Sequence, residues 1–264
     1  MISSYSANRA VTSPCVRVLG VPVHVVDVRE VLQVMEQWIC ARDGRYWIAV
    51  TSSHGIVEGH KHAEFKAILE SAALSVPDGK WTARAAARKV SCAPKQVRGA
   101  DLLWAFCDLA SHKGYSNFFY GDTEEVLALA RRKLTERFPD LKIVGTYSPP
   151  FRELTPDEDA QIIHMINQAK PDVLWVGLGL PKQEKWIFAH GDQLNVPVTV
   201  AIGAAFKFVS GKVNNAPPWI RESGFEWLWR FFQEPKRTWH RAFVYGPQFA
   251  AHTILELSGL KTYD

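Results

Sequence analysis

The chain has 264 residues, of which 47% are hydrophobic and 22% are charged, and its formal net charge is +4 at pH 7. This composition is typical of a globular protein and excludes an intrinsically disordered one. No run of Lys and Arg is present, so the mild excess of positive charge does not indicate nucleic acid as a partner.

No segment has the hydrophobicity of a membrane span or a signal peptide. Met1–Pro14 is polar, and no window of about 18 uninterrupted apolar residues occurs. The cysteines at positions 15, 40, 92 and 107 lack CxxC spacing, which argues against a zinc site and a disulfide framework. We therefore expect buried, reduced thiols in a cytoplasmic protein that contacts membranes only at their surface.

Strands and helices are predicted to alternate along most of the chain. The expected strands are Val16–Val26 (one strand or a hairpin), Tyr46–Val50, Leu74–Val76, Asn117–Tyr120, Lys142–Gly145, Asp172–Val176 and Pro197–Ile202. The expected helices are about 27–39, a stretch up to 72, 80–89, 100–113, 122–138, 155–169 and 182–191. Such alternation predicts an α/β fold, a parallel sheet with helices on both faces.

Local signals place helix starts and a change of organisation. Capping boxes are predicted to open three helices, at Asp27-x-x-Glu30, Asp122-x-x-Glu125 and Thr155-x-x-Glu158. The composition changes near 211–218, where Asn-Asn-Ala-Pro-Pro favours a linker or turn. We therefore divide the chain into an α/β domain over 1–212 and an appendage over 213–264.

Three predicted strands end in polar or glycine-rich tails. These tails are Thr51-Ser52-Ser53-His54, Pro77-Asp78-Gly79-Lys80 and the segment from Gly177 to Glu184. In an open α/β sheet, ligands bind beyond the carboxyl ends of the strands. We therefore expect the three tails to converge on one cleft.

Asp78 follows an apolar strand and precedes a glycine. One interpretation is a general base, whose pKa partial burial tunes. The other, which spacing alone favours, is a turn aspartate bonded to its own backbone.

The glycine-rich segment 177–184 suits a diphosphate. Its backbone N–H groups and the following helix N-terminus favour an anion, although neither a GxGxxG nor a Walker pattern is present. A tight strand-to-helix turn is the alternative. Gln183 is predicted either to hydrogen-bond a base or sugar or to be an exposed helix residue.

Arg98 precedes a predicted helix in Arg98-Gly99-Ala100-Asp101. Its planar guanidinium suits a phosphate, and a surface ion pair with Asp101 is the alternative. No HExxH motif occurs, and His54, His60 and His62 are expected to be solvated, so we predict no metal site.

Residues 216–246 combine aromatic and basic side chains. The tryptophans Trp219, Trp227, Trp229 and Trp239 lie among Arg221, Arg230, Lys236, Arg237 and Arg241. Such side chains suit an anionic lipid surface. Aromatics at 225, 229, 232, 239 and 243 have helical spacing, so a core-facing stripe is the alternative. Trp227 and Phe231 fall off this stripe, and Pro235 interrupts it.

These residues together resemble the WecG/TagA/CpsF glycosyltransferases, glycosyltransferase family 26. The matching positions are Thr51, Pro77-Asp78-Gly79, Arg98-Gly99-x-Asp101-Leu102, Gly177-Leu178-Gly179-x-Pro181-Lys182-Gln183-Glu184, Ala216-Pro217-x-Trp219, Glu226-Trp227-Leu228-x-Arg230 and Gln233-Glu234-Pro235-Lys236-Arg237. The resemblance covers about residues 16–245.

The resemblance implies a Rossmann-like core, a membrane-docking C-terminal appendage and a metal-independent enzyme without a cofactor. Such enzymes move a sugar from a UDP-sugar to a polyprenyl-pyrophosphate-linked saccharide at the cytoplasmic membrane face, and related enzymes self-associate. It implies Asp78 as the base. The implied donor site comprises Thr51, Ser53, Arg98, Gly177, Gly179, Lys182 and Gln183, and the implied acceptor and membrane site comprises Trp219, Arg230, Arg237 and Arg241.

The sequence departs from the family pattern at three positions. Ser53 replaces a usual Asn, Asn215 a frequent Arg, and His240 a common Arg. Family donors include UDP-N-acetylmannosamine, its uronic acid and UDP-glucose. Ser53 favours UDP-glucose, as in xanthan-type exopolysaccharide synthesis. A non-catalytic nucleotide-binding recruitment module and an NAD-dependent oxidoreductase are the competing functions, and the missing GxGxxG argues against the latter.

Overall fold

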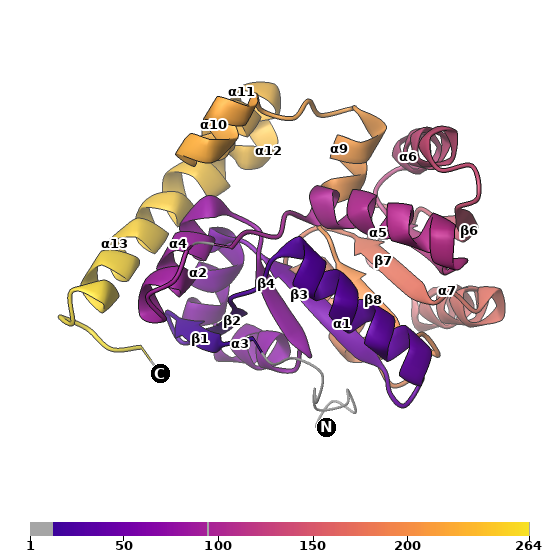
Figure 1. The fold of residues 1–264 in the computed structure, drawn as a ribbon, viewed down its shortest axis with the longest axis horizontal. Helices are drawn as coiled ribbons and strands as arrows, with labels where there is room; N and C mark the ends of the chain where they lie inside the picture. The colour runs from indigo at the N-terminus through magenta and orange to yellow at the C-terminus, as the bar shows by residue number, and fades with distance from the viewer. Residues whose placement is uncertain (1–12, 94, 264) are drawn as a thin grey trace.

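The computed structural model describes residues 13–93 and 95–263 (Figure 1). The N-terminal segment in which no signal peptide is expected therefore lies, up to residue 12, outside the described residues. The centre of the fold is a six-stranded parallel sheet of order β4-β3-β8-β7-β5-β6. Its strands are β3 Tyr46–Thr51, β4 Leu74–Pro77, β5 Ser116–Gly121, β6 Lys142–Tyr147, β7 Val173–Gly177 and β8 Val198–Ala201.

Helices cover both faces of this sheet, as the alternating pattern predicts. The helices of the α/β part are α1 Val28–Ala41, α2 Ser53–Lys61, α3 Ala63–Glu70, α4 Lys80–Lys89, α5 Gly99–Lys113, α6 Glu124–Arg137, α7 Pro156–Ala169, α8 Lys182–His190 and α9 Ala205–Ser210. Apolar residues of α1, α5, α6 and α9 form one core with the sheet. Residues of α2, α3, α4, α7 and α8 form the core on the other face.

The first predicted strand is a hairpin. β1 Cys15–Val18 and β2 Val21–His24 pair antiparallel and form a separate two-stranded sheet. Leu19 and Gly20 make the turn, both with positive φ. The hairpin belongs to the same core as α2 and α3, so it extends the layer on that face.

Two of the three predicted capping boxes are confirmed. Asp27 and Glu30 bond reciprocally, as do Thr155 and Glu158. The prediction for Asp122 is wrong by one residue, because Asp122 has a φ of 49° and stays outside the helix. Its carboxylate accepts the Thr123 N–H at 3.0 Å, and the Thr123 hydroxyl caps the helix through the Val126 N–H.

The helical stretch predicted up to residue 72 consists of two helices. α2 and α3 are separate because His62 between them is extended, with φ −123° and ψ 104°.

Cys107 is buried, whereas the other three cysteines are exposed and unpaired, so the expectation of buried thiols is confirmed for Cys107 alone.

The C-terminal part is a series of helices that follows α9. These are α10 Pro218–Ser223, α11 Glu226–Gln233, α12 Pro235–His240, the π-helix η1 Arg241–Tyr245 and α13 Gly246–Leu257. We call residues 213–263 the tail. Figure 1 shows α10, α11 and α12 grouped together, with α13 running down beside α2 and α4. Pro235 ends α11 and starts α12, as expected from its ring.

The stripe of tail aromatics does not face the core. Four of its five members, Phe225, Phe232, Trp239 and Phe243, are exposed although their spacing is helical, and the fifth, Trp229, is partly exposed and donates its Nε1 hydrogen to the Asn214 carbonyl at 3.3 Å. Trp227 and Phe231, which fall off the stripe, are only partly exposed and contact Phe243 edge to face. Among the described residues, no helix is both long and apolar enough to cross a bilayer.

Candidate active site

The three polar strand ends lie on one edge of the sheet. Thr51 at the end of β3 pairs with Pro77 at the end of β4, and its carbonyl accepts the Asp78 N–H at 3.0 Å. Gly177 ends β7, which is separated from β3 only by β8. All these strands are parallel, so the carboxylate of Asp78 and the glycine turn share the carboxyl edge.

Asp78 is held by residues distant in the sequence. Its Oδ1 accepts the Gly99 N–H at 3.2 Å, and its Oδ2 lies 3.9 Å from a guanidinium nitrogen of Arg241. Only a glycine fits at position 99 without a shift, because a Cβ there would lie 2.9 Å from the Ile202 carbonyl oxygen, and this close packing brings the Gly99 N–H to Asp78. Both partners lie outside the turn of Asp78 itself. The second carboxylate oxygen therefore faces the tail, next to a cation.

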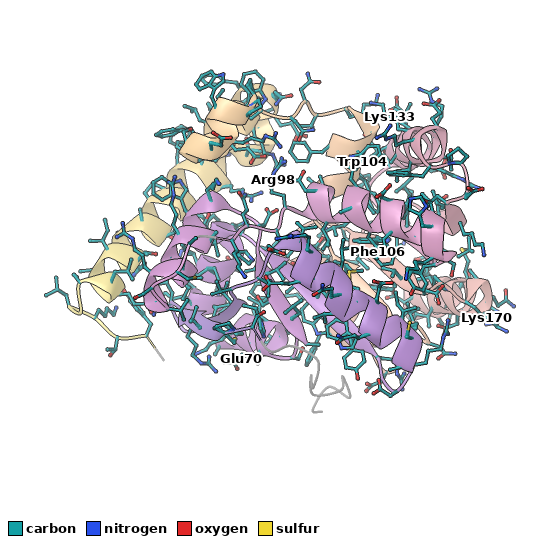
Figure 2. The ribbon with its side chains drawn as sticks, in the orientation of Figure 1. Glu70, Arg98, Trp104, Phe106, Lys133 and Lys170 are labelled. Atoms are coloured by element: carbon teal, nitrogen blue, oxygen red, sulfur yellow. The ribbon has the colours of Figure 1, made fainter. Side chains whose placement is uncertain are left out.

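Arg98 joins the start of α5 to the tail (Figure 2). Its side chain is buried, with 7% of the residue exposed. The guanidinium donates to Asp101 at 3.1 Å, to Glu226 at 2.6 Å and to Asn215 at 3.2 Å. Burial opposes the charged form, but the carboxylates of Glu226 and Asp101 outweigh it and raise the pKa of Arg98. Glu226 and Asn215 thus tie the buried Arg98 to the tail, whereas Asp101, with 47% of its side chain exposed, forms its pair with Arg98 at the protein surface.

Arg230 and Arg241 bring two more guanidiniums to the same place. Arg230 lies 5.0 Å from the centre of the Phe208 ring, and Arg98 approaches the same ring at 5.7 Å. Burial and the charge of Arg241 lower the pKa of Arg230 to about 10, so it stays charged at neutral pH. Two cations, Arg98 and Arg230, therefore lie against Phe208, and a third, Arg241, lies beside Asp78.

The glycine turn after β7 is fixed by Gln183. Its Oε1 accepts the Gly179 N–H at 3.3 Å and the Gly203 N–H at 2.9 Å. Both glycines have positive φ, 82° and 57°. Of the two interpretations of Gln183, the exposed helix residue is wrong, since 2% of Gln183 is exposed. Lys182, in contrast, is exposed at the start of α8.

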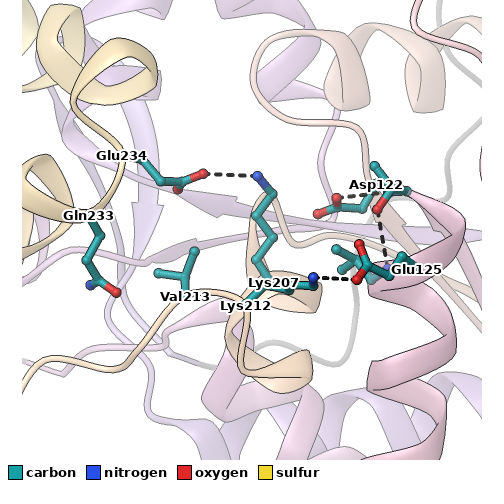
Figure 3. A pocket seen from close by; sticks show the side chains of 9 residues that line it. Asp122, Glu125, Lys207, Lys212, Val213, Gln233 and Glu234 are labelled. Atoms are coloured by element: carbon teal, nitrogen blue, oxygen red, sulfur yellow. Dashed lines mark hydrogen bonds and ion pairs between the residues drawn. The ribbon is translucent and has the colours of Figure 1, made fainter.

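A cavity of about 370 Å³ opens next to this edge, beyond the end of β5 (Figure 3). The start of α6, the α9 region and the joint between α11 and α12 line it. Lys207 bonds Glu234 across it at 3.0 Å, and Lys212 pairs with Glu125. The cavity lies between the sheet and the tail and is lined by acidic and basic side chains, but by no residue of the three strand-end tails, so it is not the cleft on which we expected them to converge.

His54 is part of the site, contrary to the sequence expectation of a solvated histidine. Its ring lies 4.0 Å from that of Tyr245, whose hydroxyl donates to Glu58 at 3.0 Å. Burial and the nearby charge of Arg241 lower the pKa of His54 to about 4, so the imidazole is neutral. The only sequence signal was its place in the first strand-end tail.

The remaining predicted residues occupy defined places. Thr51 is buried with its hydroxyl 3.1 Å from that of Ser75, and Ser53 is the first residue of α2. Trp219 lies on the outer side of α10 with 71% of its surface exposed. Arg237 lies on α12, and its side chain is outside the part that the structure describes. Within the described ranges, no group of three His, Cys, Asp or Glu side chains is placed to hold a metal ion.

Residues 16–262 match the sequence model of the Glycosyl transferase WecG/TagA/CpsF family. The chain belongs to this family. It is similar to N-acetylglucosaminyldiphosphoundecaprenol N-acetyl-beta-D-mannosaminyltransferases of Staphylococcus aureus, among them those of strains MW2, NCTC 8325 and COL. Each is 25% identical over 223 residues, which cover 84% of this chain and 86% of the relative. This WecG/TagA/CpsF member is therefore a glycosyltransferase, and the two non-transferase alternatives are set aside.

Proposed function

We propose that this glycosyltransferase moves a sugar from a UDP-sugar to a saccharide linked to polyprenyl diphosphate, for the synthesis of a cell-surface polysaccharide. One observation carries the proposal: a carboxylate, Asp78, at the sheet edge lies near guanidiniums that the tail contributes, Arg241 at 3.9 Å and the buried Arg230. A carboxylate supplies the base, and cations receive a departing diphosphate.

The reaction has one displacement. Asp78 takes the proton of an acceptor hydroxyl while that oxygen bonds to the anomeric carbon of the donor sugar. The bond between this carbon and the diphosphate oxygen breaks, and UDP leaves with the electron pair. Arg98, Arg230 and Arg241 offer positive charge to the leaving group in a partly buried environment, where such charge acts strongly. The cavity beyond β5 offers room for the nucleoside.

The proposal includes the identity of the donor sugar, for which there are two candidates. The relatives transfer N-acetylmannosamine, which supports UDP-N-acetylmannosamine as the donor. Ser53 at the start of α2 presents a hydroxyl where the family resemblance leads us to expect an amide, and this favours UDP-glucose as the second candidate. Incubating the protein with each UDP-sugar and a short-chain lipid-diphosphate saccharide, and weighing the product by mass spectrometry, distinguishes the two.

The exposed tail aromatics support peripheral contact with the inner face of the cytoplasmic membrane. Trp219 and Phe232 each expose more than 70% of their surface, and indole and phenyl rings prefer the lipid interface. Sedimentation with vesicles of anionic phospholipid measures this. Trp219→Ser and Phe232→Ser should each weaken binding, whereas Phe151→Ser, at an even more exposed residue outside the tail, should not. Self-association, which the family resemblance implies, is a further part of the proposal.

The decisive experiment replaces the base. Asp78→Asn should lower kcat by about 10²- to 10⁴-fold and leave UDP binding and the unfolding midpoint near wild type. Asp108→Asn on the exposed side of α5 is the matched control and should keep full activity. An active Asp78→Asn enzyme would contradict the role of Asp78.

A further inference from the structure

Two glycine turns at the carboxyl edge are tied together by one carboxamide. Gly179 lies in the turn from β7 to α8, and Gly203 lies in the turn from β8 to α9. The Gln183 Oε1 accepts the backbone N–H groups of both, at 3.3 Å and 2.9 Å. This oxygen is thereby engaged with backbone donors, and Gln183 sets the distance between the two turns.

Such a tie works only if the amide of Gln183 has one orientation. With its oxygen and nitrogen exchanged, the amide would direct its Nε2 hydrogens at two backbone N–H groups, and three donors would face one another. The structure holds the working orientation through Glu184, whose Oε1 accepts the Gln183 Nε2 at 2.8 Å. In the exchanged orientation, the Gln183 oxygen would face the Glu184 oxygen, so that contact would be lost too.

Glu184 lies in the first turn of α8 and is almost fully buried, which is rare for a glutamate. Only 1% of it is exposed, and its Oε2 has no hydrogen-bond partner among the described residues. Burial raises the pKa of Glu184 to about 7, so near neutral pH much of it is uncharged. An uncharged acid still accepts through its carbonyl oxygen, and it adds no negative charge to an edge that receives a diphosphate.

We propose that Glu184 is a positioning residue for the donor, which orients the Gln183 amide and thereby holds the turns at Gly179 and Gly203 in the spacing that the diphosphate needs. The inference rests on the proposed function, since it places the donor diphosphate at this edge. It assigns Gln183 a different role from the sequence interpretation: the side chain shapes the site through the backbone and does not contact the base or the sugar.

The test measures binding of UDP alone by calorimetry, together with hydrogen exchange of the Gly179 and Gly203 amides. Glu184→Met removes the acceptor with little change of volume. It should weaken UDP binding by about tenfold or more and speed exchange at both glycines, because the Gln183 amide loses its orientation. Glu184→Gln keeps an oxygen for the Gln183 Nε2 and should bind UDP like the wild type.

A reciprocal exchange makes the argument independent of simple destabilisation. At pH 8.5, where Glu184 has lost its proton, Gln183→Glu alone places two carboxylates opposite each other and should weaken UDP binding. The double change Gln183→Glu with Glu184→Gln supplies an acceptor for both glycines and a donor opposite it, so binding should recover. A merely structural role predicts no such recovery.

Asn117→Leu is the matched control for loss of a buried polar group. Asn117 is buried in β5 and accepts the Trp175 Nε1 hydrogen at 2.9 Å, far from the carboxyl edge. This variant should unfold more easily but bind UDP with unchanged affinity.

The outcomes separate the two proposals. Normal UDP binding by a folded Glu184→Met variant, or no recovery in a folded double variant, overturns the role of Glu184 while the proposed function stands. Faster exchange at the glycines with unchanged UDP affinity also overturns it, since the turns would then not position the donor. A wild-type protein that does not bind UDP overturns the proposed function first, and the positioning role with it.

Discussion

Glu184 makes a quantitative prediction about stability and pH. Burial raises its pKa from 4.5 to about 7 in the folded protein. A folded-state pKa above the unfolded one means that the group costs no stability below about pH 4.5 and destabilises increasingly as the pH rises towards 7. A shift of one unit corresponds to about 1.4 kcal/mol, so the cost between pH 5 and pH 8 is about 2–3 kcal/mol.

Glu184→Gln removes this titration and keeps the acceptor for Gln183. We therefore expect the stability difference between Glu184→Gln and the wild type to change by about 2–3 kcal/mol from pH 5 to pH 8, in favour of the variant. Urea unfolding of both proteins at the two pH values measures it, and every other titrating group cancels in the comparison. An equal difference at pH 5 and pH 8 would refute the burial argument.

Four further predictions concern the site. Gly99→Ala places a Cβ 2.9 Å from the Ile202 carbonyl oxygen, so it should lower the free energy of unfolding by about 1–3 kcal/mol. It should also lower kcat, because the shifted backbone moves the residue 99 N–H away from Asp78. Gly246→Ala, whose Cβ would have no neighbour closer than 3.6 Å, is the control and should change neither quantity. His54→Phe should leave the kcat profile between pH 6 and 9 unchanged, because His54, with a pKa of about 4, is already neutral there; loss of an ionisation near pH 6.5 would contradict this. Arg241→Gln should lower kcat about tenfold, because it removes a cation that faces the leaving diphosphate, and the exposed Arg88→Gln on α4 is the control that should leave kcat unchanged. A chain ending at residue 212 should lose both vesicle binding and activity, and full activity would remove the tail from the site.

The sequence predicts what local interactions determine. The capping boxes at Asp27 and Thr155 close within three residues, so their side chains report the helix start directly. At Asp122 the same pattern fails, because the sheet edge places that residue at a positive φ, and its neighbour Thr123 caps the helix instead. The buried apolar runs likewise predict the strands in their order along the chain. The order of the strands within the sheet could not be predicted from periodicity.

The site depends on contacts that no spacing reports. Arg98 meets Glu226 across 128 positions, and Asp78 meets Arg241 only because the tail folds back over the sheet edge. Gln183 has the pattern of a surface helix residue, yet two backbone donors from different turns require it in the interior. Asp78, Arg98 and Gln183 were candidates from their places beside predicted strand ends and a helix start, the family resemblance implied their roles, and their geometry came from the fold.

In the tail, α11 presents Phe232 outward and Arg230 inward. On the proposed function, the enzyme acts on an acceptor that is confined to the lipid surface, and adsorption to lipid completes the site for the leaving group in the same step. Turnover should then scale with the mole fraction of acceptor in the lipid surface rather than with its bulk concentration, and diluting the acceptor with inert lipid should slow the enzyme at constant total acceptor.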